Sequence, residues 1–273
     1  MKLSFYICLL TLNTFALTKE IDLTGRIFNG KDAPPGKWPF YSLLVIRAVE
    51  GADERSACGC VVIATRWIVS AAHCTAGHPA DTLFVHAGFP TSMILDYEQA
   101  SGVKAKHEHP EFNAFYVLND IVLLELYKEL KFNSLVRPIS LPESKAQIKV
   151  GKECKIVGFG KTGGEETLQE RKLQEGDVTV ISKFDCLFAY GHIIRDSNIC
   201  ANHPTAATGS CKGDSGGPLA CFDDGRNEYV LRGVTSFGAT HCGDNTTPEV
   251  WSRITWYLDW MNEKMRDTNG LLT

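Results

Sequence analysis

The sequence predicts an all-β fold with a single α-helix near the C-terminus. From Trp38 onward, short apolar runs rich in β-branched residues are separated by Gly, Pro, Asn and Asp. This is the pattern of strands and turns in a β-barrel or β-sandwich. One later stretch, 254–265, departs from the pattern and carries its apolar residues at helical spacing.

The predicted strands fall in seven apolar runs. They are residues 41–46, 61–63, 67–70, 121–126, 155–158, 178–181 and 229–236. The polar segment 142–151 follows a long β-rich stretch, and we place the connection between two domains there.

The predicted helix has one apolar face. Tyr257, Leu258, Met261 and Met265 recur at helical spacing, and charged side chains lie outside this stripe. We therefore expect an amphipathic helix that packs on the core, followed by a tail over 266–273.

Composition and charge are ordinary for a globular protein. Hydrophobic residues make up 44% of the chain and charged residues 22%, and the formal net charge is −4. No basic run indicates nucleic-acid binding, and no single-sign tract indicates a disordered tail. We therefore predict no nucleic-acid partner.

The first residues have the layout of a secretory signal peptide. Lys2 precedes an apolar run at 3–12, and small or polar residues follow up to Ala16. A buried strand or a membrane anchor is the alternative, but a spanning helix needs about 20 apolar residues. We predict a signal peptide over 1–16, an extracellular location and no membrane partner.

The cysteine content fits an exported protein, because disulfides persist outside the cytosol. The chain has 10 cysteines, of which Cys8 lies in the predicted signal peptide. The remaining number is odd, so at least one thiol lacks a partner within the chain.

Three segments carry residue types suited to nucleophilic catalysis. His73 follows an apolar run, Asp120 precedes another, and Ser215 lies in the glycine-rich segment 211–218. Alone, each has a simpler explanation: a packed histidine, a turn or capping aspartate, and an ordinary turn.

The glycine-rich segment is the hardest to explain as an ordinary turn. Glycines on both sides of Asp214 and Ser215 allow a tight, strained backbone that exposes one hydroxyl and aligns successive N–H groups. Acyl transfer needs this arrangement, since a serine requires a base and the oxyanion requires preorganised donors.

The three segments resemble the active-site motifs of the chymotrypsin/trypsin family of serine endopeptidases, in that family's order of His, Asp and Ser. The resemblance implies that Ser215 attacks the scissile carbonyl of a protein or peptide and that His73 relays the proton. Asp120 would hold the His73 tautomer and stabilise its charged form. The N–H groups of Gly213 and Ser215 would form the oxyanion hole.

The resemblance covers nearly all of the chain after Arg26. It implies two six-stranded antiparallel β-barrels with the triad at their interface, followed by a C-terminal α-helix. On this basis we expect a propeptide over 17–26, an N-terminal barrel over 27–145, and a C-terminal barrel and helix over 146–265.

The same resemblance implies four disulfides. They are Cys58–Cys74, Cys154–Cys221, Cys186–Cys200 and Cys211–Cys242. Cys60 is left over, and the favoured interpretation is a buried, inert thiol that acts as a small apolar residue. An intermolecular disulfide is the alternative.

A second interpretation of these cysteines is a zinc site formed by Cys58, Cys60, His73 and Cys74, whose ligand types qualify. An exported chain favours disulfides over such a site. We predict no metal and no cofactor.

The segment 26–30 resembles the activation site of the family. Cleavage after Arg26 would free the Ile27 amine, which would pair with Asp214, because a buried carboxylate strongly prefers a paired cation. The alternative is that Arg26 is merely an exposed basic residue. An activating protease and protein inhibitors are the partners implied, and a monomer is expected.

By resemblance, a set of residues forms the substrate pocket. They are Gly209, Ser210, Lys212, Ser236, Phe237, Gly238 and Glu249. Gly209 at the base and Gly238 in the wall predict a chymotrypsin-like preference for Phe, Tyr, Leu or Met.

Glu249 modifies this prediction. A pocket with glutamate at this position resembles that of cathepsin G, which accepts aromatic and basic residues. We therefore expect Lys and Arg as second-choice substrates. Alternatively, Glu249 turns away from the pocket or stays protonated in a poorly solvated site.

Asn245 lies in an N-glycosylation sequon followed by Pro248, and its occupancy stays open. The rival function is a non-catalytic homologue that acts as a binding or toxin module. Such proteins usually lack a triad residue, whereas all three are present here.

Overall fold

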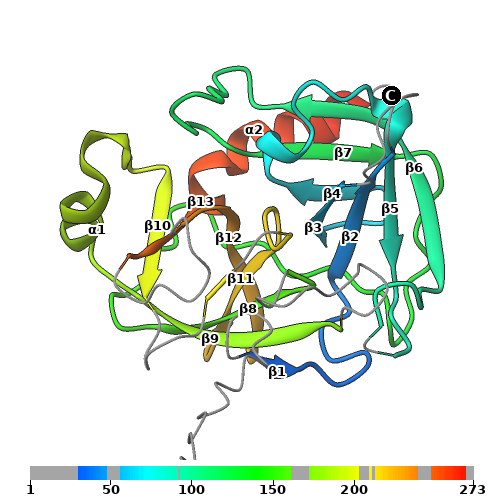
Figure 1. Cartoon of the computed structure of the whole chain (residues 1–273), viewed down its shortest axis with the longest axis horizontal. Coiled ribbons are helices and arrows are strands. Elements are labelled where there is room, and N and C mark those ends of the chain that lie inside the picture. The colour runs from blue at the N-terminus through cyan, green and yellow to red at the C-terminus, as the bar shows by residue number, and fades with distance from the viewer. Residues whose placement is uncertain are drawn as a thin grey trace, which may run out of the picture.

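A computed structural model describes residues 30–47, 56–91, 93–160, 172–202, 209–210, 213–238 and 247–268. Within these residues the chain folds into two closed antiparallel β-barrels that lie side by side, with helix α2 beside the first (Figure 1). The fold class predicted from the sequence is confirmed.

The first barrel has the hydrogen-bonded order β2-β3-β4-β7-β6-β5 and closes through pairing of β5 with β2. Its strands are β2 (Tyr41–Ile46), β3 (Ser56–Val62), β4 (Trp67–Ser70), β5 (Leu83–Ala87), β6 (Gln99–Glu108) and β7 (Val122–Leu126). Every residue of β4 and β7 is buried, because these strands lie between the barrel core and the rest of the molecule.

The second barrel has the order β8-β9-β10-β13-β12-β11 and closes through pairing of β8 with β9. Its strands are β8 (Glu153–Gly158), β9 (Gln174–Val180), β10 (Asn198–Asn202), β11 (Pro218–Asp223), β12 (Glu228–Phe237) and β13 (Glu249–Arg253). The short strand β1 (Lys31–Asp32) adds to the edge of β9. The polar segment 142–151 lies in the connection between β7 and β8.

Helix α2 (Ile254–Thr268) follows the second barrel in sequence and contacts the first in space. Its predicted apolar stripe is buried at Tyr257, Leu258 and Met261. Tyr257 packs against His109 with ring centroids 5.2 Å apart and donates a hydrogen bond to Asn119 Oδ1 at 3.2 Å. Burial raises the pKa of Tyr257 to about 12.

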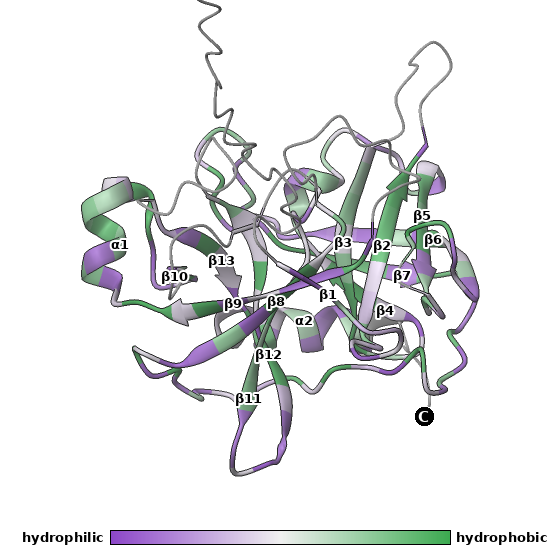
Figure 2. Cartoon of the chain, turned by 60° about the horizontal axis from the view of Figure 1, so that its bottom comes forward, coloured by the Kyte–Doolittle hydropathy of each residue, from purple (hydrophilic) through white to green (hydrophobic). Residues whose placement is uncertain are grey.

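A second helix, α1 (Lys183–Tyr190), corrects the expectation of a single helix. Ser182 begins it by accepting a hydrogen bond from the backbone N–H of Asp185 at 3.1 Å. Phe184 and Phe188 are 77% and 91% exposed, so the helix lacks a continuous apolar face toward the core. Figure 2 shows α1 projecting at the edge of the molecule with hydrophobic and hydrophilic residues along it.

The other helical turns in the described residues are the 3-10 segments η1 (Ala72–Cys74), η2 (Ala80–Thr82) and η4 (Gly191–Ile193). No helix in the described part of the chain is both long and apolar enough to cross a membrane.

Candidate active site

The pairing of β4 with β7 brings His73 and Asp120 together. Ser70 at the end of β4 lies opposite Val122 at the start of β7, so the residues after β4 meet those before β7. His73 Nδ1 lies 2.7 Å from Asp120 Oδ2, and the backbone N–H of His73 donates to Asp120 Oδ1 at 2.8 Å.

Asp120 is 1% exposed, and donors from both barrels surround it. Ser236 Oγ, from β12, donates to Asp120 Oδ2 at 2.5 Å, and Ser252 Oγ, from β13, donates to the Asp120 backbone oxygen at 2.6 Å. A buried carboxylate is costly unless it is fully hydrogen-bonded, and these contacts meet that requirement.

Ser236 was predicted only as a residue of the substrate pocket, and Ser252 was not predicted as a site residue. Neither serine belongs to a recognisable local motif. Both reach Asp120 only because the second barrel packs against the first.

The charge of Asp120 controls the protonation of His73. Burial of the imidazole ring lowers the pKa of His73, but the hydrogen bond to Asp120 and the charge of its carboxylate together outweigh burial. The net effect raises the pKa of His73 above its ordinary value, because both interactions favour the imidazolium.

The turn that carries Ser215 requires glycine for two reasons. Gly213 and Gly216 have φ angles of 105° and 79°, in the left-handed region. A Cβ on Gly216 would also collide with Ser70 Oγ and the Gly59 carbonyl oxygen. Gly59 N–H donates to the Ser215 carbonyl oxygen at 2.8 Å, which fixes the turn against β3.

This packing places the Ser215 turn next to the segment that precedes His73. Ser70 Oγ and the Ala71 backbone nitrogen both lie close to Gly216. Among the described residues, Ser215 Oγ makes no hydrogen bond to His73, and the N–H groups of Gly213 and Ser215 donate to no protein acceptor. Hydrogen bonds between catalytic groups often tighten only when substrate is bound.

Asp214 lies in a niche walled by glycines. It is 3% exposed, and its Oδ1 accepts from the backbone N–H of Gly160 at 2.7 Å. A Cβ on Gly158 or on Gly160 would overlap the carboxylate. The niche therefore fits a buried carboxylate closely.

Three of the four implied disulfides are present: Cys58–Cys74, Cys154–Cys221 and Cys186–Cys200. Cys211 and Cys242 lie outside the described residues. Cys60 is a free thiol with no exposed surface, and burial raises its pKa well above the ordinary value. It therefore packs as a small apolar residue on β3.

The alternative zinc site does not fit this arrangement. Cys58, His73 and Cys74 do lie together, with the ligand atoms within 4.8 Å of one another. However, the two sulfurs are bonded to each other and offer no thiolate. His73 also directs Nδ1 to Asp120.

Glu249 points at the predicted pocket base. It is 5% exposed, and its two carboxylate oxygens accept from Ser210 N–H at 2.5 Å and Ser210 Oγ at 2.7 Å. A Cβ on Gly238 would lie 3.1 Å from Glu249 Cγ. The structure thus places three of the predicted pocket residues, Ser210, Gly238 and Glu249, close together.

The wall beyond Gly238 is aromatic. Phe237 packs edge-on against Tyr190 of α1, with ring centroids 5.3 Å apart, and Tyr190 Oη donates to the Pro248 carbonyl oxygen at 2.5 Å. Gly209 is buried beside Ser210. Besides Cys211 and Cys242, four predicted site residues lie outside the described part of the chain: Arg26, Ile27, Lys212 and Asn245.

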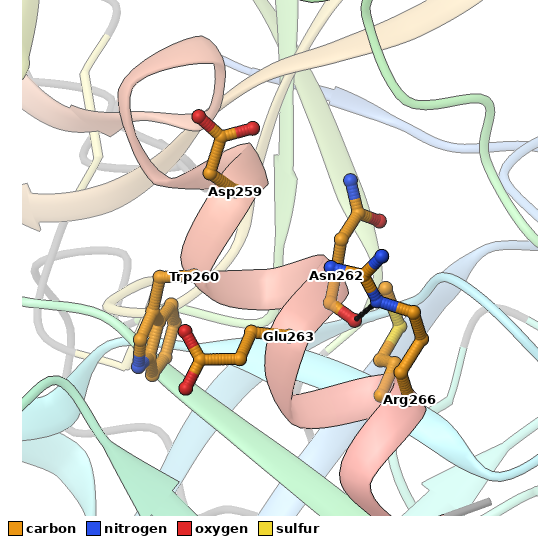
Figure 3. Close-up of a pocket in the computed structure, with 6 residues that line it drawn as sticks. Asp259, Trp260, Asn262, Glu263 and Arg266 are labelled. Carbon is orange, nitrogen blue, oxygen red and sulfur yellow. Dashed lines mark hydrogen bonds between the residues drawn. The ribbon is translucent and has the colours of Figure 1, made fainter.

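A separate surface hollow lies on α2 and is lined by Asp259, Trp260, Asn262, Glu263, Met265 and Arg266 (Figure 3). The hydrogen bond drawn there joins Arg266 Nε to the Asn262 carbonyl oxygen at 3.2 Å. The residues that line the hollow include no serine, cysteine or histidine, so it has none of the side-chain types of His73 and Ser215.

Residues 27–261 match the family described as Trypsin. Duodenase-1 of Bos taurus is 32% identical over 254 residues, which cover 92% of this chain and 94% of the relative. Serine protease 56 of Homo sapiens is 34% identical over 245 residues, covering 88% of this chain and 39% of the relative. The atrial natriuretic peptide-converting enzyme of Mus musculus is 32% identical over 243 residues, covering 88% and 21%. The chain thus spans less than half the length of the last two relatives.

Proposed function

The chain belongs to the trypsin family of serine endopeptidases, and we propose that it hydrolyses peptide bonds of protein substrates with His73, Asp120 and Ser215. The observation that carries this proposal is the buried Asp120, bonded to His73 Nδ1 at 2.7 Å beside the glycine-shaped Ser215 turn. The same three groups form the catalytic triad that this family uses, so the roles below follow that known mechanism.

In the proposed reaction, Ser215 Oγ attacks the carbonyl carbon of the scissile bond while His73 Nε2 accepts the hydroxyl proton. The oxyanion is held by the N–H groups of Gly213 and Ser215. His73 then gives its proton to the leaving amine, which leaves an acyl group on Ser215. Water, deprotonated by His73, releases the acyl group and restores the serine.

The test is hydrolysis of a mixed peptide library after cleavage of the chain at Arg26. We expect peptide products with defined new ends, identified by mass spectrometry. A cut protein that releases no products, yet captures other proteins with a fixed stoichiometry, would instead support the rival binding or toxin module.

Activation by cleavage after Arg26 is also part of the proposal. The described residues that follow this site are held on the second barrel. Strand β1 pairs with β9, with Lys31 opposite Glu175, and the Ala33 N–H donates to the Leu173 carbonyl oxygen at 2.8 Å. The new Ile27 amine would enter the niche of Asp214, and this ion pair would hold the Ser215 turn in its working shape.

Replacing Asp214 with Asn is expected to lower kcat/KM of the cut protein by about 10²- to 5 × 10³-fold. This range corresponds to the roughly 3–5 kcal/mol lost when one partner of a buried ion pair is removed. The measurement is steady-state hydrolysis of one fluorogenic peptide. The control is Asp177→Asn, which breaks a surface ion pair with Lys155 and should change the rate little. Equal rates for both variants would contradict the activation scheme.

We also propose that the protein acts outside the cell, after residues 1–16 have been removed. Three disulfides in the described residues support an oxidising compartment. We also propose the fourth bridge, Cys211–Cys242, the domain limits 27–145 and 146–265, and a monomer. An activating protease and protein inhibitors are its expected partners.

For substrate choice we propose Phe, Tyr, Leu and Met first and Lys or Arg second. Gly209 and Gly238 leave room for a large side chain, which supports the first class. Glu249 supports the second, since its carboxylate lies against Ser210 at the predicted pocket base, where it would attract a substrate cation.

Replacing Glu249 with Gln is expected to lower kcat/KM for Lys and Arg peptides about 10- to 100-fold, the range for loss of one charged hydrogen bond. Phe and Leu peptides should change less than about threefold, because glutamine keeps the shape of the pocket. A panel of peptides that differ only at the cleaved position measures both. The matched control is Glu153→Gln, an exposed site on β8. If Glu249→Gln lowered kcat/KM equally for Phe and Lys peptides, Glu249 would not be the residue that selects basic side chains.

A further inference from the structure

The segment that leads into Asp120 has two residues in left-handed backbone conformations. Val117 and Asn119 both have φ angles of 51°. This conformation is costly for a β-branched residue but tolerable for asparagine, whose short polar side chain can form local hydrogen bonds. Asn119 Nδ2 donates to the Glu111 carbonyl oxygen at 3.1 Å, which ties the turn to the chain before it. The direction in which the chain enters Asp120 therefore depends on how Asn119 is held.

Asn119 is also held from helix α2, by Tyr257. Tyr257 Oη donates to Asn119 Oδ1 at 3.2 Å. Tyr257 is 1% exposed, its ring packs against His109, and its hydroxyl shares a further hydrogen bond with the Ser197 side chain. The side-chain amide of Asn119 is thus bonded at its nitrogen within the first barrel and at its oxygen by α2.

A second contact holds the residue that follows Asn119. Ser252 Oγ donates to the Asp120 carbonyl oxygen at 2.6 Å. Ser252 lies in β13, which runs directly into α2, so Ser252 and Tyr257 belong to one continuous segment of chain. This segment therefore holds two consecutive residues, and the second of them bonds to His73.

We propose that Tyr257 is a positioning residue for Asp120 and that it acts through the side chain of Asn119. The inference rests on the proposed role of the triad. While the hydrogen bond is in place, Asn119 keeps its left-handed conformation and the Asp120 carboxylate stays aligned with His73 Nδ1. Small displacements of a catalytic group lower the rate even when every group is present.

The phenol of Tyr257 remains a hydrogen-bond donor over the pH range in which His73 titrates. Burial raises the pKa of Tyr257 to about 12, and the negative charges of Asp120 and Glu111 act in the same direction. The other titratable group against the ring is His109, and burial lowers the pKa of that imidazole. Deprotonation of Tyr257 therefore makes no contribution to the acid limb of activity.

The test replaces Tyr257 with Phe, which keeps the ring and removes the hydroxyl. We expect kcat of the cut protein to fall about 3- to 10-fold with KM unchanged, the scale of one lost hydrogen bond. The pKa of His73, followed by NMR titration of its ring signals beside those of His109, should fall as well. The reason is that the carboxylate of Asp120, which raises this pKa, would be less well aligned.

The matched control is Tyr229→Phe, at a half-buried tyrosine of β12 whose ring packs against Trp38. It should change neither kcat nor the pKa of His73. An unchanged pKa of His73 in Tyr257→Phe would overturn the proposal, because a merely structural role for Tyr257 would lower stability and leave this pKa in place.

A second variant, Asn119→Gly, keeps the left-handed conformation accessible and removes the amide. It should itself lower the pKa of His73, and Tyr257→Phe should have no further effect in its background. An unchanged pKa in Asn119→Gly would overturn the proposal even if Tyr257→Phe failed to fold. The titrations need no substrate. If they give the expected results while the parent protein hydrolyses no peptide, the positioning of Asp120 stands and only the proposed activity fails.

Discussion

Replacing Ser215 with Ala lowers kcat of the cut protein by about 10⁶-fold, the scale expected when a triad nucleophile is removed. The alanine leaves no atom to form the acyl intermediate, and His73 has no proton to accept. The turn itself should survive, since its shape depends on Gly213, Gly216 and the bond from Gly59 to the Ser215 carbonyl oxygen. Pre-steady-state and steady-state hydrolysis of a fluorogenic peptide measure the loss.

The matched control is Ser182→Ala. Ser182 caps α1, so its loss should cost about 1 kcal/mol of stability without changing kcat. If Ser215→Ala retained even a hundredth of the parental rate, Ser215 would not be the nucleophile.

Replacing Asp120 with Asn should lower kcat by about 10⁴-fold, the size known for this change in a protease of this family. The amide would keep much of the packing around Ser236 and Ser252 but would favour the wrong tautomer of His73. It would also no longer stabilise the imidazolium formed during proton transfer.

The pH profile separates this role from a structural one. In the parent protein, activity should fall as the pH drops through the raised pKa of His73, since only the neutral imidazole acts as a base. In Asp120→Asn, burial remains while both interactions that raise the pKa are lost. The acid limb of kcat/KM should therefore move to lower pH. If the acid limb of the kcat/KM profile did not move in Asp120→Asn, Asp120 would not control the pKa of His73.

Much of the fold could be predicted because the buried strands have clear sequence patterns. Residues 67–69 and 122–124 are continuous apolar runs, and they lie in β4 and β7. Strand β6 has only two buried residues, Ser101 and Val103, and Lys104 and Lys106 follow them, so it has no apolar run. Helix α1 was missed because its phenylalanines face outward.

Only those residues of the candidate site that lie in short local motifs could be predicted from the sequence. His73, Asp120 and Ser215 each lie in a short recognisable segment. Ser252 reaches Asp120 across the interface of two barrels, a contact that depends on tertiary packing alone.

Active-site labelling tests the central claim most directly. A fluorophosphonate bonds to a serine only when a neighbouring base and oxyanion donors activate it. After cleavage at Arg26, we predict one label per chain, located by mass spectrometry on Ser215, and none in His73→Ala. A cut protein that takes no label, or takes it on another residue, would contradict the assignment of His73, Asp120 and Ser215 as a working triad.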